Sequence, residues 1–454
     1  MNANARSSFH LAKALLPDGW ADHVRMTVAD GLIAEIETDA TPQADDARLG
    51  IVLPGLPNLH SHAFQRGMAG LAERRGSSDD SFWTWRETMY HFVDRLTPDH
   101  LQAIAALAYI EMLESGFTRV GEFHYLHHDR DGRPFADPAA MSAAIVAAAQ
   151  DSGIALTHLP VFYAHAGFGG LPPGEGQRRF IHDIDDFATL LDRLRALLAP
   201  LPDAVLGVAP HSLRAVTPEE LGKLVSIADG PIHIHVAEQV KEVEDCIAWS
   251  GARPVEWLLG AMPIDRRWCF VHATHMTQTE TQAMAASGAV AGLCPITEAN
   301  LGDGLFPTEP FLTAGGAYGI GSDSNILIDA TEELRLLEYG QRLGARGRNI
   351  LAPAGGSTGG TLYRDAVRGG AQALGAPAGL AVGASADFLT LDDDHPSLVG
   401  RKGDALLDGL IFAAGRPAID GVWRRGHRLV EKGRHAHRDR IVARYRRTLT
   451  EILA

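Results

Sequence analysis

The sequence predicts an α/β protein built around a (β/α)₈ barrel of the TIM type, with a small β-sandwich side domain made from both chain ends. Three observations lead to this prediction. Short apolar runs alternate with helical patterns through the middle of the chain, strand-type alternation occupies the two ends, and polar clusters follow the apolar runs. The expected boundaries are 1–50 with 380–454 for the side domain and 51–379 for the catalytic barrel.

The side domain is expected to begin with a β-hairpin. Apolar residues alternate over 24–28, an Asp-Gly turn follows at 30–31, and the chain returns over 32–36. Near the other end, 386–391 reads as a short strand and 421–432 as a second hairpin. Neither set of strands is large enough to be stable alone, so we expect the two ends to pair into one domain.

The barrel strands are expected at eight short apolar runs: 51–59, 119–123, 154–162, 205–209, 232–236, 269–271, 289–293 and 317–320. Helix signals lie between them. Thr97-Pro98 supplies a cap and a first-turn proline for a helix that stops at Gly116, and residues 217–220 form a capping box. Eight strand–helix units over about 280 residues favour a closed barrel over an open, doubly wound sheet.

One connection is much longer than the others. Residues 63–96 separate the first barrel strand from its helix and contain Trp83, Trp85 and Arg86. Loops between a strand and the next helix usually have roughly 2–6 residues. We therefore expect this segment to form a lid over the barrel mouth.

The composition limits the kinds of partner that the protein is expected to bind. The chain has 454 residues, 46% of them hydrophobic, and a formal net charge of −15. This balance excludes global disorder and argues against nucleic acid or an anionic membrane as a partner. The three cysteines cannot form a disulfide framework, and the first ten residues lack the apolar core of a secretory signal. We expect a cytoplasmic protein whose partner is a small molecule.

Histidines at the predicted strand ends indicate a metal site. His60 and His62 are two apart, so both rings lie on the same side of one strand. His235 ends the fifth strand and Asp323 follows the eighth, which completes a set of three nitrogens and one oxygen. Such a set suits Zn²⁺, with Fe²⁺ as the alternative. None of the five lysines ends a strand, so we expect one divalent metal and no carboxylated-lysine bridge.

These residues resemble a known family. The segment 54–65 (PGLPNLHSHAFQ), the run 235–238 (HVAE), His272 and Ser322-Asp323 are similar to the motifs of the amidohydrolase superfamily. Within it, the chain resembles the formimidoylglutamate deiminases of histidine degradation. The likeness covers essentially the whole chain, and it implies a homodimer.

The resemblance implies a hydrolytic reaction. Metal-bound hydroxide would attack the formimidoyl carbon of N-formimidoyl-L-glutamate, giving N-formyl-L-glutamate and ammonia. Glu238 would carry protons between the water and the departing nitrogen. His272 would hydrogen-bond the developing tetrahedral oxygen, and Asp323 would ligate the metal and accept a proton.

Substrate recognition is expected to rest on arginine. A glutamate moiety carries two carboxylates, and the planar guanidinium fork of arginine matches them. Arg214 follows the fourth strand and Arg86 lies in the long connection. The resemblance implies that both hold the substrate together with Gln65, Tyr125 and His211.

Other interpretations stay open at this level. One is an aminohydrolase of a ring amidine, such as a guanine- or adenosine-like base, which shares the metal set but needs no pair of carboxylate-binding arginines. Another is a non-catalytic relative with a structural zinc. Glu238 could also be only a helix cap. Cys294, at the end of the seventh strand, is expected to be a small wall residue and not a nucleophile. Surface or lid positions are expected for the histidines outside the motifs: His124, His127, His128, His165 and His275.

Overall fold

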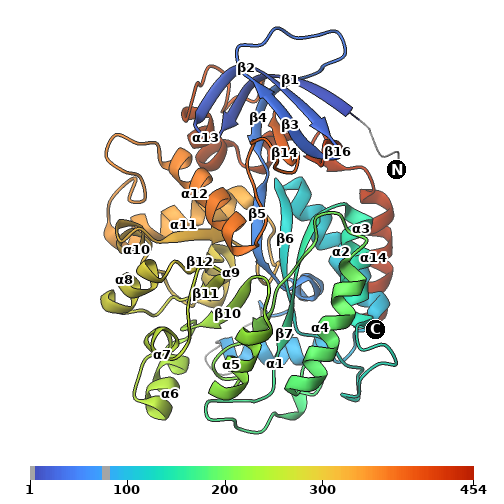
Figure 1. Ribbon diagram of the computed structural model, residues 1–454, viewed down its shortest axis with the longest axis vertical. Coiled ribbons are helices and arrows are strands. Elements are labelled where there is room, and N and C mark those ends of the chain that lie inside the picture. The colour runs from blue at the N-terminus through green and yellow to red at the C-terminus, as the bar shows by residue number, and fades with distance from the viewer. Residues whose placement is uncertain (1–5, 74–81) are drawn as a thin grey trace.

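The barrel is one of two sheets in the computed structural model, which describes residues 6–73 and 82–454 (Figure 1). Its strands are β5 (Leu56–Ser61), β6 (Phe117–His124), β7 (Ala155–Phe162), β8 (Val205–Leu206), β9 (Ala209–Pro210), β10 (Ile232–Val236), β11 (Trp268–His272), β12 (Val290–Leu293) and β13 (Ala317–Ile320). They run in the order β10-β11-β12-β13-β5-β6-β7-β8, with β9 beside β7. All these pairs are parallel, and a parallel bridge between Val208 and Ile232 closes the ring. The predicted barrel is confirmed.

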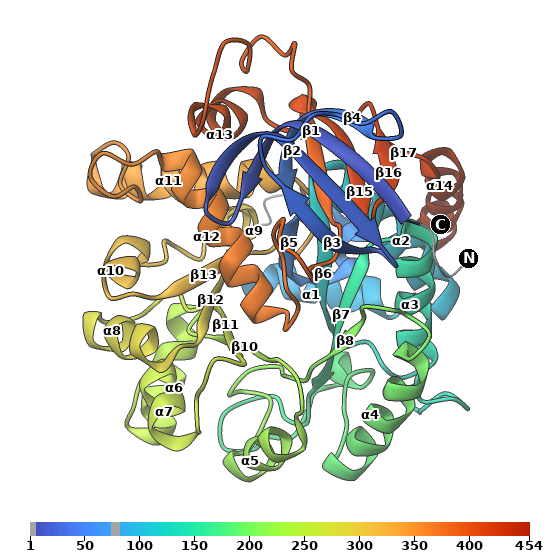
Figure 2. The ribbon, with the colours of Figure 1, turned by 45° about the horizontal axis from the view of Figure 1, so that its top comes forward.

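Most of the helices surround these strands (Figure 2). The described α-helices are α1 (Phe82–Val93), α2 (Pro98–Glu114), α3 (Ala140–Ser152), α4 (Ile184–Leu198), α5 (Pro218–Ile227), α6 (Val240–Ser250), α7 (Pro254–Ala261), α8 (Gln278–Ser287), α9 (Pro295–Leu301), α10 (Thr308–Thr313), α11 (Ala330–Ala345), α12 (Thr358–Ala373), α13 (Ala405–Gly409) and α14 (Arg438–Leu453). Thr97 caps α2 by accepting from the backbone N–H of His100, and Thr217 caps α5 within its capping box, both as predicted.

The expected single strand over 51–59 is divided at Gly55. β4 (Ala47–Pro54) belongs to the terminal sheet, where it pairs with β1 (Arg6–Leu16) and β14 (Phe388–Leu391), and β5 begins the barrel. A Cβ atom on Gly55 would lie 2.3 Å from the side chain of Thr118, so only glycine fits where the chain passes between the sheets.

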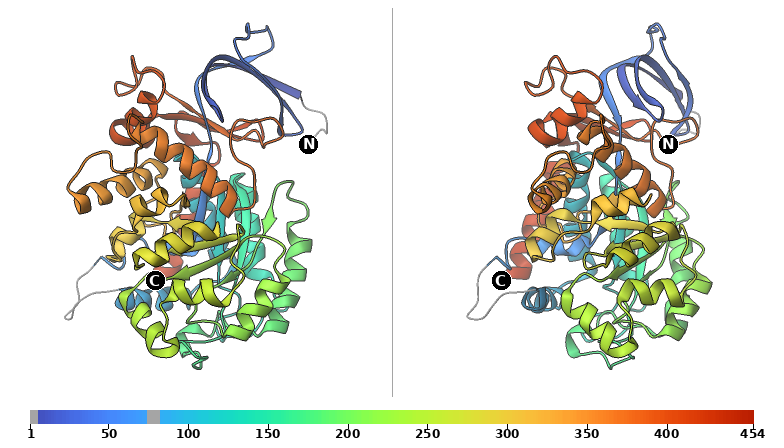
Figure 3. Two further views of the ribbon diagram at one scale, coloured as in Figure 1. Left: turned by 60° about the vertical axis from the view of Figure 1, so that its left-hand side comes forward. Right: turned by 90° about the vertical axis from the view of Figure 1, so that its left-hand side faces the viewer.

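The terminal sheet contains strands from both chain ends, as predicted (Figure 3). Its order is β17-β16-β15-β14-β4-β1-β2-β3, where β2 is Gly19–Ala29, β3 is Leu32–Glu37, β15 is Ile419–Arg424, β16 is His427–Glu431 and β17 is Arg434–His435. The two ends share a small core in which Phe388 stacks on Trp423 and meets Phe9 edge-on. This core holds the side domain together.

The long connection contains more regular structure than a loop. A 3₁₀ helix covers Ala63–Met68 and α1 covers Phe82–Val93, while 74–81, part of the predicted lid, lies outside the described residues. Met89, Phe92 and Val93 of α1 are buried against the barrel core, which explains why this part is helical. Among the described helices, none has the length and apolar character needed to cross a bilayer.

Candidate metal centre and active site

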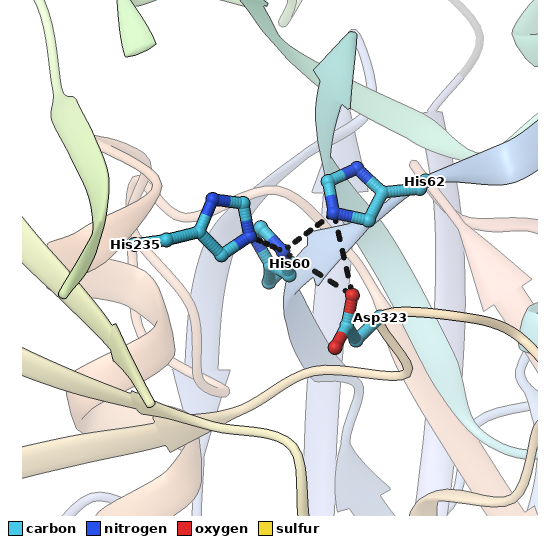
Figure 4. Close-up of side chains that lie close together, drawn as sticks. All are labelled: His60, His62, His235 and Asp323. Atoms are coloured by element: carbon cyan, nitrogen blue, oxygen red, sulfur yellow. Dashed lines mark hydrogen bonds and ion pairs between the residues drawn. The ribbon is translucent and has the colours of Figure 1, made fainter. Parts of the chain in front are cut away.

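Three imidazoles and one carboxylate converge at the carboxyl ends of the barrel strands (Figure 4). Nε2 of His60 lies 3.2 Å from Nε2 of His62 and 3.1 Å from Nε2 of His235. Oδ1 of Asp323 lies 3.3 Å from Nε2 of His62 and 3.5 Å from Nε2 of His60. The structure therefore brings together the four residues that the sequence singles out.

The hydrogen bonds of the outer ring nitrogens fix how these imidazoles face one another. His62 Nδ1 donates to the carbonyl of Phe123 at 2.9 Å, and His235 Nδ1 donates to the carbonyl of His211 at 3.0 Å. A carbonyl only accepts, so in the neutral rings both Nε2 atoms carry lone pairs. These lone pairs point at the Nε2 atom of His60. A shared cation satisfies all three nitrogens, whereas one hydrogen on His60 could satisfy only one partner.

Burial keeps the imidazoles in the form that a metal requires. Burial lowers the pKa of His60 to about 3, and burial likewise lowers the pKa of His62 and, with the neighbouring imidazoles, that of His235. Burial opposes the charge of Asp323, but the hydrogen bond and charge of His60 bring the pKa of its carboxyl below the ordinary range. Neutral imidazoles and an ionised carboxylate are metal ligands.

The spacing of the four ligand atoms fits a small cation. With bonds of about 2.0–2.2 Å, a tetrahedral ion separates its ligand atoms by about 3.3–3.6 Å. The closest contacts here are 3.1–3.5 Å, and all four atoms lie within 4.8 Å of one another. The residues present therefore suit zinc or a similar first-row ion.

The turn after β13 positions Asp323 through contacts that sequence patterns did not reveal. The side-chain amide of Asn325 donates to the carbonyl of His62 at 3.0 Å and to the hydroxyl of Ser61 at 3.1 Å. Asp323 itself has φ +44°, and His272 has φ +66°. Left-handed backbone costs about 1–3 kcal/mol in residues other than glycine and persists where the surroundings enforce it. Both strained residues point into the site.

Glu238 and His272 form the second half of the site. His272 Nε2 lies 3.8 Å from Oε1 of Glu238, and His272 Nδ1 lies 3.2 Å from Oε1 of Glu298. Burial raises the pKa of Glu238 to about 7, the range in which a carboxyl exchanges protons at neutral pH. Although burial opposes the charge of His272, Glu238 and Glu298 raise its pKa well above the ordinary value.

A cavity open to solvent is lined by His62, His235 and Asp323 of the ligand cluster and by Arg86 and Arg214. The guanidinium of Arg86 lies 4.6 Å from the ring centre of Trp83, and that of Arg214 lies 5.9 Å from the same ring. Nε of Arg214 is buried and has no hydrogen-bond partner, and no ion pair of Arg214 occurs within the described residues. The cavity thus presents two cations in addition to the metal-type ligands.

The remaining predicted binding residues line the same cavity. Gln65 donates from its amide to the hydroxyl of Tyr125 at 2.9 Å, and its amide oxygen is buried without a partner. His211 lies beside Tyr163, with ring centres 4.6 Å apart, and burial together with Arg214 lowers its pKa well below the ordinary value. These groups offer neutral hydrogen-bonding atoms between the metal-type ligands and the arginines.

Several histidines lie elsewhere than the sequence indicated. The expectation of surface or lid positions is wrong for His124, His127 and His128, which are buried together with His158 and His182. Their imidazoles pack in pairs beside β6 and β7, a tertiary environment that local sequence does not encode. His233 is also a packed residue, and its Nε2 donates to the carbonyl of Ala373 at 2.7 Å.

Comparisons with known proteins agree with this geometry. The model of the amidohydrolase family matches residues 51–429, and that of the N-terminal domain of formimidoylglutamate deiminase HutF matches 7–50. The chain is 54% identical to formimidoylglutamate deiminase of Pseudomonas aeruginosa, covering 98% of this chain and 100% of that protein. It is 28% identical to 8-oxoguanine deaminase of the same species, covering 88% and 89% of the two chains.

Two solved structures share the fold of this chain. An amidohydrolase from Brucella melitensis is 57% identical, with a TM-score of 0.95 over 99% of this chain and 100% of that one. A zinc-bound adenosine deaminase from Xanthomonas campestris, 22% identical, shares the fold with a TM-score of 0.80 over 98% of each chain.

Proposed function

The chain belongs to the amidohydrolase family, and we propose that it hydrolyses N-formimidoyl-L-glutamate to N-formyl-L-glutamate and ammonia. The observation that carries this proposal is the cavity itself. Its lining contains both metal-type ligands and the arginines Arg86 and Arg214, so it suits a molecule with a hydrolysable group and carboxylates. The identity to a formimidoylglutamate deiminase over nearly the whole chain supports the same reaction.

We infer that one divalent ion, Zn²⁺ in preference to Fe²⁺, is held by His60, His62, His235 and Asp323. Such an ion lowers the pKa of a bound water towards about 7, so that hydroxide is available at neutral pH. The three imidazoles supply neutral ligands, and the single carboxylate leaves a net positive charge beside the reacting carbon.

The protein's own groups then move the protons. Glu238 takes a proton from the water while the oxygen of the water bonds to the formimidoyl carbon. The C=N double bond thereby becomes a C–N single bond. His272 stabilises the charge on the tetrahedral oxygen. Glu238 then donates its proton to the terminal nitrogen, the C–N bond breaks, and ammonia leaves while the carbonyl of the formyl group forms. The formimidoyl nitrogen is protonated in the substrate, and Asp323 accepts the second proton of the water, so the departing nitrogen carries three hydrogens and the oxygen none.

We assign the glutamate part of the substrate to the opposite wall. Arg86 and Arg214 pair with its two carboxylates, and Gln65, Tyr125 and His211 hydrogen-bond the chain between the carboxylates and the formimidoyl group. The unpartnered Nε of Arg214 and amide oxygen of Gln65 support this assignment, because buried polar atoms usually have a partner.

Ammonia release tests the proposal against a ring-amidine aminohydrolase. Zinc-loaded enzyme is expected to release ammonia from N-formimidoyl-L-glutamate. In Arg214→Met, kcat/KM should fall about ten- to a hundredfold, since a charge-assisted contact contributes about 1.5–3 kcal/mol. Zinc content serves as the control and should not change. Absence of turnover by the zinc-loaded wild type, or an unchanged kcat/KM in the variant, would contradict the proposal.

We further infer that the enzyme acts as a cytoplasmic homodimer on a free dicarboxylate, with neither nucleic acid nor a membrane as partner. The net charge of −15 supports the absence of a polyanionic partner. The homodimer rests on the likeness to the deiminase family alone.

A further inference from the structure

Asp323, one of the proposed metal ligands, also belongs to a second set of donor atoms. Asp323 uses Oδ1 towards His60 and His62, and its other oxygen, Oδ2, lies 3.7 Å from Nε2 of His272 (Figure 4 shows this oxygen without a contact to the drawn imidazoles). Cys294 joins this set: its Sγ, an Asp323 oxygen and a His272 nitrogen lie within 4.8 Å of one another.

Glu238 lies next to this set, with its Oε1 3.8 Å from Nε2 of His272. Glu238, Cys294 and Asp323 follow β10, β12 and β13, and His272 is the last residue of β11; these four strands are neighbours in the sheet. The set of mutually close donor atoms therefore comprises one nitrogen, one sulfur and one carboxylate oxygen.

The hydrogen-bond contacts of His272 favour its imidazole as a metal ligand. Its Nδ1 contacts the carboxylate of Glu298 at 3.2 Å, and Glu298 is held by the backbone N–H of Cys294 at 2.9 Å. A carboxylate on the outer nitrogen is the usual companion of a metal-binding histidine, because it orients the ring and makes Nε2 a better ligand.

We propose that His272, Cys294 and Asp323 form an inhibitory site for a second, thiophilic divalent cation. The separation of 3.7 Å between Nε2 of His272 and Oδ2 of Asp323 suits a cation somewhat larger than zinc, such as Cd²⁺. Coordination releases the thiol proton to solvent, together with a proton on the His272 nitrogen where one is bound, and no electron is transferred. Inhibition follows because the cation occupies His272 and Asp323, which stabilise the tetrahedral oxygen and accept a proton in the proposed reaction.

Cadmium titration of enzyme that already holds one zinc ion tests this site. The expected result is an ultraviolet thiolate-to-cadmium charge-transfer band that saturates at one added equivalent, with deiminase activity lost in parallel. Exchange at the three-histidine centre would give no such band, because that centre contains no sulfur. The band does not depend on the proposed reaction, so failure of the reaction and failure of this site are distinguishable.

Two cysteine variants make the test specific. Cys294→Ala should lose the band, keep its turnover without added cadmium and need at least tenfold more cadmium for inhibition, and Cys294→Ser should behave alike if the alanine variant does not fold. Cys269→Ala is the matched control, because Cys269 is also buried and lies on β11 outside the set; it should keep both band and inhibition. No band in the wild type, a band that persists in Cys294→Ala, or full turnover at saturation would overturn the proposal.

Discussion

Glu238 shows how a single side chain acquires its chemistry from its position. Its carboxyl is buried at a strand end beside His272, and its backbone N–H is held by Glu242 at 3.2 Å. The alternative interpretation, a helix cap, does not fit this arrangement, because α6 begins at Val240 after Gln239 and no side chain provides its cap. The carboxylate is therefore available to exchange protons.

Replacing Glu238 with Gln tests this assignment. The amide keeps the shape of the side chain but cannot accept a proton, so kcat should fall by about 10²–10⁴. Steady-state kinetics on protein with unchanged zinc content would measure the loss. A variant that retains near-normal kcat would show that another group moves the protons.

At the residue scale, the sequence was informative where a residue type occurs at the end of an apolar run. His60, His62, His235 and Asp323 could be predicted because strand ends of a barrel converge. Glu298 and Asn325 could not, since their role is to hold another side chain or backbone turn, and such contacts leave no periodic pattern in the sequence.

At the element scale, α1 places Arg86 in the lining of the cavity, and hydrogen bonds from another arginine hold the end of α1 against the barrel. The fully buried Arg179 donates to the backbone carbonyls of Val93 and Leu96, the latter at 3.1 Å, and to that of His128 at 3.0 Å. These contacts fix the end of α1 relative to the site. The sequence predicts a lid over this segment. It does not predict the helix, because the apolar residues that would indicate one, such as Met89 and Phe92, are few and lie among aromatic residues.

A double-mutant cycle tests whether Arg179 acts through Arg86. Arg179→Met should lower kcat/KM about tenfold or more, since misplacing a binding group by about 1 Å can cost up to a hundredfold. In the Arg86→Met background the same change should have little further effect, giving a coupling of about 0.5–3 kcal/mol. Fully additive losses would instead indicate that Arg179 only stabilises the fold.

At the scale of the whole molecule, a partly buried ion pair joins the barrel to the terminal sheet. Asp203, before β8, lies 2.6 Å from Arg424 of β15 and 3.3 Å from Arg119 of β6. Burial opposes the charge of Asp203, but the two arginines bring the pKa of its carboxyl below the ordinary value. The ionised form is therefore favoured in the folded protein.

Replacing Asp203 with Asn should lower the free energy of unfolding by about 1–3 kcal/mol at neutral pH. Because the folded-state pKa is lowered, the contribution is complete above the unfolded value of about 3.9 and is lost as pH falls through the folded value. The difference in unfolding midpoint between wild type and variant should thus shrink below about pH 4. Asp229→Asn is the control, since the carboxylate of Asp229 is exposed, and it should change little at any pH.

The architecture as a whole could be predicted from alternating strand and helix signals, but its division at Gly55 could not. The run 51–59 is apolar except for Asn58, because the residues that β4 and β5 contribute to it are buried, each strand in a different sheet. Hydrophobicity reports burial and does not tell which sheet a strand joins. The boundary depends on a close approach to Thr118 that only tertiary structure reveals.

Anomalous scattering from crystals of the zinc-loaded enzyme, recorded on both sides of the zinc edge, tests the central claim most directly. We predict one strong peak about 2.0–2.2 Å from Nε2 of His60, His62 and His235 and from a carboxylate oxygen of Asp323. A fully active enzyme whose crystals show no peak there, or in which the His235 imidazole turns away from the other two, would contradict it.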